Sequence, residues 1–207
     1  MLKPHAPTIA ATFSPPVMEA RRWLDGVTMP ADRPLLNLSQ AAPVAPPPPA
    51  LRAALAAAVA EDDSHMYGPV LGLPALRTEI ATRWSRDYRG DIRAKDVAIT
   101  SGCNQAFTAV MSTIATAGDS VILPTPWYFN HKMWLDMQGI TTIPLPCSAG
   151  MLPKPADAEA LINSTTRAIV LVSPNNPTGA EYPREVLAGF VDLARRNGLA
   201  LIIDETY

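Results

Sequence analysis

The chain has 207 residues, a length that allows one large domain or two small ones. Hydrophobic residues make up 48% of it and its net charge is −2, which favours a sizeable core and argues against nucleic acid as its main partner. The two cysteines, Cys103 and Cys147, suit a reducing compartment, and no stretch is typical of a signal peptide or a membrane span. A cytoplasmic location without membrane contact is therefore expected.

The first 100 residues are predicted to form an arm followed by helices. Pro15 and Pro16 favour the start of a short helix that runs through Trp23. Residues 42–49 contain five prolines and are expected to form an extended, polyproline-like connector. Apolar spacing and proline at a first turn predict two more helices, at residues 50–60 and 74–88.

From residue 97 onward, short β-rich runs alternate with helical patterns. Strands are expected at residues 97–100, 120–123, 141–143, 168–172 and 199–204. Helices are expected at residues 104–117, 129–137 and 183–196. Because the strands are continuous apolar runs, the pattern predicts a parallel sheet covered on both faces, which is a three-layer α/β/α fold.

A glycine turn follows the first of these strands. Residues 100–106 read Thr-Ser-Gly-Cys-Asn-Gln-Ala, a strand end, a turn at Gly102 and a helix start. A helix start directs backbone N–H groups and the positive end of the helix dipole at an anion. The turn is a candidate phosphate site, although an ordinary strand–helix turn shares its pattern.

The most specific motif follows the strand at residues 168–172. Residues 173–179 read Ser-Pro-Asn-Asn-Pro-Thr-Gly, and two X-Pro bonds restrict the loop and hold Asn176 in one orientation. A cis bond is expected before Pro177, because a rare backbone state is kept where a site needs it. Ligands bind at the carboxyl ends of strands in α/β sheets, which favours a functional loop over a merely stiffened turn.

Two more segments end at the same sheet edge. Asp204 closes the apolar run of residues 199–203, and Tyr207 follows three residues later. A buried carboxylate there needs a partner, whereas the alternative is an exposed strand-end carboxylate without function. Residues 126–131 offer aromatic rings and the imidazole of His131, with a place in the core as the alternative.

Together these segments resemble the fold-type-I enzymes that use pyridoxal 5'-phosphate (PLP), and among them the class I and II aminotransferases of the aspartate aminotransferase kind. The resemblance covers residues 36–207. Its most specific part is Asn-Pro-Thr-Gly at 176–179 followed by Asp-x-x-Tyr at 204–207. Residues 67–72 look like the family's Tyr-x-x-x-x-Gly segment, and residues 37–48 resemble its early substrate-side loop.

The resemblance implies residues that bind the phosphate and the ring of PLP. The turn at Gly102 would bind the phosphate through the amides of Cys103 and Asn104. Tyr128 would stack on the pyridine ring. Tyr67 would reach across the interface of a homodimer to the phosphate in the partner subunit.

The resemblance also implies residues that bind the polar edge of the ring. Asn176 and Tyr207 would hydrogen-bond its phenolic oxygen. Asp204 would pair with the ring nitrogen, and His131 would support that carboxylate from behind. Ala41 stands on the substrate side where the family usually has glycine, so substrate identity is not carried over. No metal is implied.

The family's Schiff-base lysine follows the aspartate, so the catalytic residue is expected beyond Tyr207 and this chain alone is expected to be inactive. Its own lysines all precede Asp204: Lys3, Lys95, Lys132 and Lys154. In the family, the strand that corresponds to residues 97–100 pairs with strands that are also expected beyond Tyr207. Without them, that strand would be separated from the sheet that ends at residues 199–204. The fold is therefore expected to be C-terminally truncated.

The resemblance implies an aminotransferase that moves an amino group between an amino acid and a 2-oxo acid. Residues 1–45 would be an N-terminal arm and small-domain segment, and residues 46–207 a partial PLP-binding large domain. Two alternatives stay open. One is another PLP reaction on the same scaffold, such as a carbon–sulfur lyase or a cyclopropane-forming synthase. The other is a non-catalytic module with the same fold.

Overall fold

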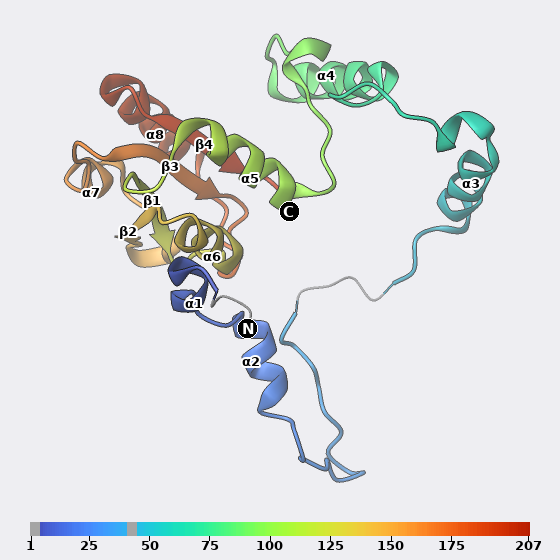
Figure 1. The fold of residues 1–207 in the computed structure, drawn as a ribbon, viewed down its shortest axis with the longest axis horizontal. Helices are drawn as coiled ribbons and strands as arrows, with labels where there is room; N and C mark the ends of the chain where they lie inside the picture. Colours follow the sequence, from blue (N-terminus) through green and yellow to red (C-terminus); the bar gives the residue numbers. More distant parts are fainter. Residues whose placement is uncertain (1–4, 41–44) are drawn as a thin grey trace. The chain divides into compact units, whose positions relative to one another are not determined.

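The computed structural model describes residues 5–40 and 45–207 (Figure 1). The chain divides into two compact units, residues 1–19 with 101–207 and residues 20–100. Ala41 lies outside the described residues. The predicted boundary between an arm of residues 1–45 and a domain of residues 46–207 stays a prediction.

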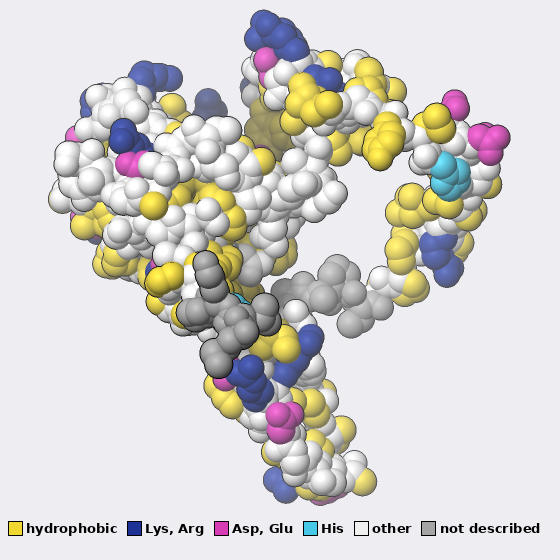
Figure 2. Space-filling view, in the orientation of Figure 1, with side chains coloured by type: hydrophobic (Ala, Val, Ile, Leu, Met, Phe, Trp, Pro, Cys, Tyr) yellow, Lys and Arg dark blue, Asp and Glu magenta, His cyan; other side chains and the backbone are white. Residues whose placement is uncertain are grey.

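Residues 20–100 form helices with almost no core. The elements are α2 (Pro16–Arg22, which extends in from the other unit), α3 (Pro49–Ala60), η1 (Asp62–His65), α4 (Pro74–Tyr88) and η2 (Ala94–Asp96). Alanine-rich sequence and Pro49 in the first turn favour α3. Its apolar residues Leu51, Leu55 and Val59 are nevertheless exposed, and Figure 2 shows hydrophobic side chains on the surface of this helix. Among the described residues of this unit, Ala81 alone is buried.

The predicted strand at residues 97–100 is wrong. The segment forms no sheet ladder, and the Ile99 N–H donates instead to the carbonyl of Leu71 at 3.0 Å. Gly72 allows this approach because its φ is +94° and a Cβ there would lie 2.5 Å from Cγ1 of Ile99. A β-rich run becomes a strand only when a second strand pairs with it, and no described strand does so here.

The sheet unit alternates strands and helices in the predicted order. Its strands are β1 (Ser120–Thr125), β2 (Thr141–Pro146), β3 (Thr166–Val172) and β4 (Ala200–Asp204). Its helices are α1 (Pro7–Ala11), α5 (Cys103–Ile114), α6 (Phe129–Met137), η3 (Ala149–Met151), α7 (Pro155–Glu159) and α8 (Arg184–Asn197). The short helices α1 and α7 were not predicted. Helix α5 ends before residue 117 because Ala115 is extended and the next amide, of Thr116, donates to Asp119.

The four strands form one parallel sheet in the order β2-β1-β3-β4. In register, Ser120 lies opposite Thr141, and Val172 lies opposite Asp204. All four strands therefore end at one edge, and the loops that follow them share that edge.

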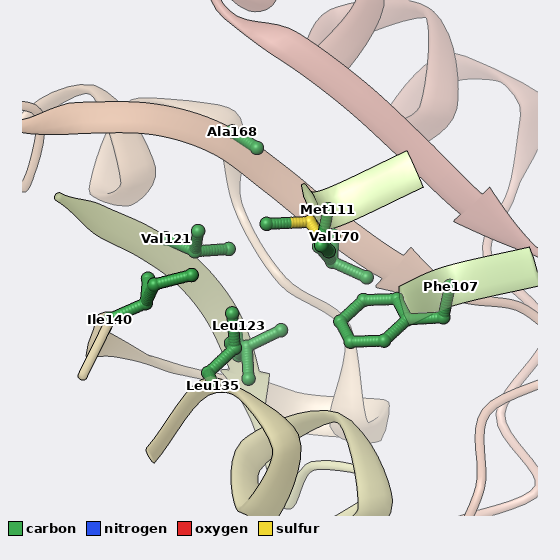
Figure 3. Packing of buried hydrophobic residues seen from close by; sticks show 8 residues of the cluster. All are labelled: Phe107, Met111, Val121, Leu123, Leu135, Ile140, Ala168 and Val170. Carbon is green, nitrogen blue, oxygen red and sulfur yellow. The ribbon is translucent and has the colours of Figure 1, made fainter. Parts of the chain in front are cut away.

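Alternate strand residues face two separate cores. One core packs against α5 and α6 and consists of Phe107, Met111, Val121, Leu123, Leu135, Ile140, Ala168 and Val170 (Figure 3). The other packs against α7 and α8 and consists of Ile122, Leu145, Ala158, Ile169, Leu171, Tyr182, Phe190 and Leu193. Helices on both faces confirm the predicted three-layer α/β fold. None of the helices in the described residues combines the length and apolarity needed to cross a bilayer.

Candidate functional site

A cleft of about 270 Å³ opens at the carboxyl edge of the sheet, a little smaller than the ~300 Å³ of the smallest usual ligand pockets. It is lined by Ser101, Gly102, Cys103, Asn104, Tyr128, Val172, Asn176, Asp204, Thr206 and Tyr207. All of these belong to the sheet unit. The structure thus brings together the predicted turn, the aromatic segment, the Asn-Pro-Thr-Gly loop and the strand-end aspartate.

Asp204 is the buried charge of the cleft, with 7% of its surface exposed. Its Oδ1 accepts hydrogen bonds from the Thr206 amide at 3.1 Å and the Thr206 hydroxyl at 2.6 Å. Its Oδ2 lies 3.2 Å from Nε2 of His131. Burial alone would raise the pKa of Asp204, but the contacts with His131 and Thr206 outweigh it and hold that pKa well below its usual range.

His131 is packed behind this carboxylate with 1% of its surface exposed. Its ring stacks on Phe107 with centroids 4.0 Å apart, and Tyr128 meets it edge-on at 5.0 Å. The Nε2 contact with Asp204 lies within ion-pair distance but lacks the alignment of a hydrogen bond, and Nδ1 has no hydrogen-bond partner among the described residues. His131 therefore contacts the carboxylate closely but not in ideal hydrogen-bond geometry.

Two phenols are held at the cleft by neighbouring carboxamides. Asn130 donates from Nδ2 to the Tyr128 hydroxyl at 2.7 Å, which fixes one edge of that ring. Asn176 donates from Nδ2 to the Tyr207 hydroxyl at 3.2 Å, so the third and fourth strands present a paired amide and phenol. Tyr207 is 59% exposed and accessible to a ligand.

The loop that carries Asn176 is organised by its buried neighbour Asn175. The Oδ1 of Asn175 accepts hydrogen bonds from the amide and hydroxyl of Thr178, and its Nδ2 donates to the hydroxyl of Tyr182 at 3.3 Å. Burial raises the pKa of Tyr182 to about 12, so this phenol stays protonated. The bond before Pro177 is cis, as predicted.

The glycine turn forms one wall of the cleft. Gly102 caps α5 with φ +88°, and the Ser101 amide donates to the side chain of Gln105. Cys103 and Asn104 follow in the first turn, where amides have no carbonyl partner within the helix. The turn can therefore bind an anion.

Comparison with known proteins places these features in one family. The model of the family "Aminotransferase class I and II" matches residues 33–207. This chain belongs to the class I and II aminotransferases.

Individual aminotransferases show the same similarity. The chain is 31% identical over 143 residues to a probable aspartate/prephenate aminotransferase of Thermus aquaticus, covering 68% of this chain and 37% of that protein. It is 32% identical to nicotianamine aminotransferase 1 of Oryza sativa subsp. japonica over 184 residues, covering 84% of this chain and 37% of that protein. The chain thus spans well under half the length of these curated relatives.

Solved structures agree with the sequence relatives. The aspartate aminotransferase of Thermus thermophilus with maleate matches with a TM-score of 0.86 and 27% identity, over 100% of this chain and 54% of that one. An alanine aminotransferase from Pyrococcus furiosus matches with a TM-score of 0.85 and 25% identity, over 99% of this chain and 52% of that one.

Two predicted site residues, Tyr67 and Ala41, stay predictions. Tyr67 lies in the unit of residues 20–100 and is fully exposed, so its role toward a partner subunit stays a prediction. Ala41 lies outside the described residues. Lys132 pairs with Asp136 and lies 5.8 Å from the ring of Trp127, and it does not line the cleft.

Sequence reasoning missed Thr206 in this aminotransferase chain. A threonine two residues after an aspartate is a known signal for a local side-chain turn, and the spacing in Asp-x-Thr could have indicated it. Cys103 was predicted only for its amide. Burial raises the pKa of its thiol, to which the nearby Asp204 carboxylate adds, whereas a contact with Thr206 lowers it; the net shift is upward.

Proposed function

We propose that the protein containing this chain is a PLP-dependent aminotransferase that moves an amino group between an amino acid and a 2-oxo acid. The observation that carries the proposal is the buried Asp204 carboxylate, which has a lowered pKa and lines the same cleft as the turn at Gly102. A buried carboxylate with a lowered pKa is suited to pair with a cation. In PLP that cation is the protonated ring nitrogen.

The other groups of the cleft fit the remaining parts of PLP. The first-turn amides of α5 suit its phosphate. The Tyr128 ring offers a flat surface for the pyridine. The amide of Asn176 and the phenol of Tyr207 suit a phenolic oxygen. An acid, an aromatic face and an anion site of this kind match one phosphorylated heterocycle better than an unphosphorylated metabolite.

The residues of this chain would have distinct tasks when PLP is bound. PLP supplies an electron-withdrawing ring that weakens bonds at the α-carbon of an amino acid. Asp204 would keep a proton on the ring nitrogen, which strengthens that withdrawal. His131 would hold Asp204 in place and keep it ionised. Asn176 and Tyr207 would orient the opposite edge of the ring.

The test is amino-group transfer by the protein at its full natural length. With PLP and a panel of amino acids, we expect conversion of a 2-oxo acid to its amino acid, detected by mass spectrometry, and no conversion without PLP. Release of ammonia or sulfide without amino-group transfer would favour the lyase alternative. Absence of PLP binding by the full-length protein would overturn the proposal.

Two further parts of the proposal concern assembly and location. The similarity to aminotransferases supports a homodimer in which Tyr67 reaches the phosphate of the partner subunit. Light scattering of the full-length protein should give the mass of a dimer. Tyr67→Phe should weaken PLP binding and leave the protein dimeric. A full-length monomer with full activity would contradict this. A cytoplasmic location is proposed from the cysteine content, and cell fractionation would test it.

A further inference from the structure

We propose that Thr206 is a positioning residue for Asp204: it occupies one carboxylate oxygen and leaves an acceptor site on the other oxygen for a cationic ring nitrogen. The inference rests on the proposed function for the identity of the ligand. It adds a residue whose side chain acts through Asp204 and has no other task in the mechanism described above.

The count of acceptor sites supports this role. An ionised carboxylate has about four lone-pair sites, two on each oxygen. Oδ1 of Asp204 receives both donors of Thr206, the hydroxyl at 2.6 Å and the amide at 3.1 Å, and is filled. Oδ2 faces His131 at 3.2 Å and keeps a second site. Without the hydroxyl, Oδ1 would have an unused site and the carboxylate could turn.

Few other groups near Asp204 could donate a hydrogen bond to its carboxylate. From α6, His131 is the titratable group that faces Asp204, and from α5 it is the thiol of Cys103. The strand β3 places uncharged Val172 opposite Asp204. The Cys103 thiol has a raised pKa and remains neutral at pH 7. Thr206 therefore supplies both donors on Oδ1, while the His131 imidazole and the neutral Cys103 thiol contact the carboxylate from α6 and α5.

Thr206 lines the cleft, and its hydroxyl donates to Asp204. Valine has the same branched shape as threonine and keeps the backbone amide donor. Serine keeps the hydroxyl and loses a methyl group. The pair Thr206→Val and Thr206→Ser therefore separates the hydrogen bond from the packing.

The experiment measures the Kd of PLP for the full-length protein by absorbance titration. We expect Thr206→Val to raise Kd about 10-fold, as is typical for loss of a hydrogen bond to a charged group. Thr206→Ser should stay within about twofold of the natural protein. In an Asp204→Asn background, Thr206→Val should change Kd less than about twofold, because the partner charge is already gone.

A 10-fold loss of PLP affinity that persists in the Asp204→Asn background would show a purely structural role and overturn the inference. The same holds if Thr206→Ser shows the loss too. If the natural protein binds no PLP, the proposed function fails. A second measurement then still tests whether Thr206 positions Asp204. In the PLP-free protein, urea unfolding is followed as the pH is lowered. The free energy of unfolding of Thr206→Val should begin to fall at a higher pH than that of the natural protein, whereas Thr206→Ser should behave like the natural protein. Equal pH dependence of all three would overturn the inference.

Discussion

The two units of this chain have similar helical sequence patterns but differ in what those patterns bury. In the sheet unit, Ile169, Val170 and Leu171 of β3 are completely buried between helices. In the unit of residues 20–100, Leu51 and Leu55 of α3 are at least half exposed. Both units contain well-formed helices, so the difference lies in the surfaces available for packing.

The comparison shows which interactions are local and which are not. A proline in the first turn and an alanine-rich sequence are enough to form α3 without burial. Burial in the sheet unit requires two sheet faces, each covered by helices from other parts of the sequence. The cleft lies entirely in the unit that has such a core, where packing holds the side chains that line it.

The largest expected effect tests the two units directly. Phe190→Ala in α8 removes a fully buried ring, and we expect the free energy of unfolding to fall by about 3–5 kcal/mol. Leu55→Ala in α3 is the matched control and should change it by less than about 0.5 kcal/mol. Urea unfolding measures both. A large cost for Leu55→Ala would mean that α3 is covered in solution, and the contrast between the units would fail.

The next effect concerns the site. Asp204→Asn keeps the size of the side chain but removes the charge, and we expect amino-group transfer by the full-length protein to fall on the order of 10²-fold or more. Circular dichroism should show an unchanged fold. Asp63→Asn, at an exposed position of η1, is the control and should keep full activity. Unchanged turnover in Asp204→Asn would remove this carboxylate from the mechanism.

Much of the fold was predictable from local patterns. The strands β1 to β4 and the long helices follow from apolar runs, helical spacing and prolines at helix starts. Residues 97–100 show the limit of prediction from local patterns. Their β-rich sequence is a property of the segment, but strand formation depends on a partner elsewhere in the chain. The end of α5 was also missed, because it depends on Asp119, which captures an amide near the C-terminal end of the helix.

The site was predictable where sequence position fixes geometry. Strand ends in a parallel sheet meet at one edge, so Asp204, Asn176 and Tyr128 had to lie close together. Side-chain partners were harder to predict. The bond from Asn130 to Tyr128 and the stacking of Phe107 on His131 depend on rotamers that the sequence does not specify.

The pH dependence of stability separates a buried carboxylate from an exposed one. The pKa of Asp204 is lowered in the folded state, so it stabilises the protein above the unfolded value of about 3.9 and loses that contribution as pH falls toward the lower folded value. Urea unfolding between pH 7 and pH 3 should show a smaller pH dependence for Asp204→Asn. Asp96 in η2 also has a lowered pKa, because of its bond to Arg93, but this pair is exposed. Salt should remove the contribution of Asp96 and spare that of Asp204; equal salt sensitivity would contradict the difference in burial.

The smallest effect should come from an exposed ion pair of α4. Arg83 and Glu79 lie 2.6 Å apart and are more than half exposed, so Glu79→Gln should lower the free energy of unfolding by no more than about 0.5 kcal/mol. At about 1 M salt, where screening acts within ~3 Å, the difference should vanish. A short contact between a carboxylate and a nitrogen is common to this pair and to His131 with Asp204, but of these two contacts the second is shielded from water. If Glu79→Gln cost as much as a buried substitution and resisted salt, α4 would have to be covered in solution, and exposure would no longer distinguish the two units.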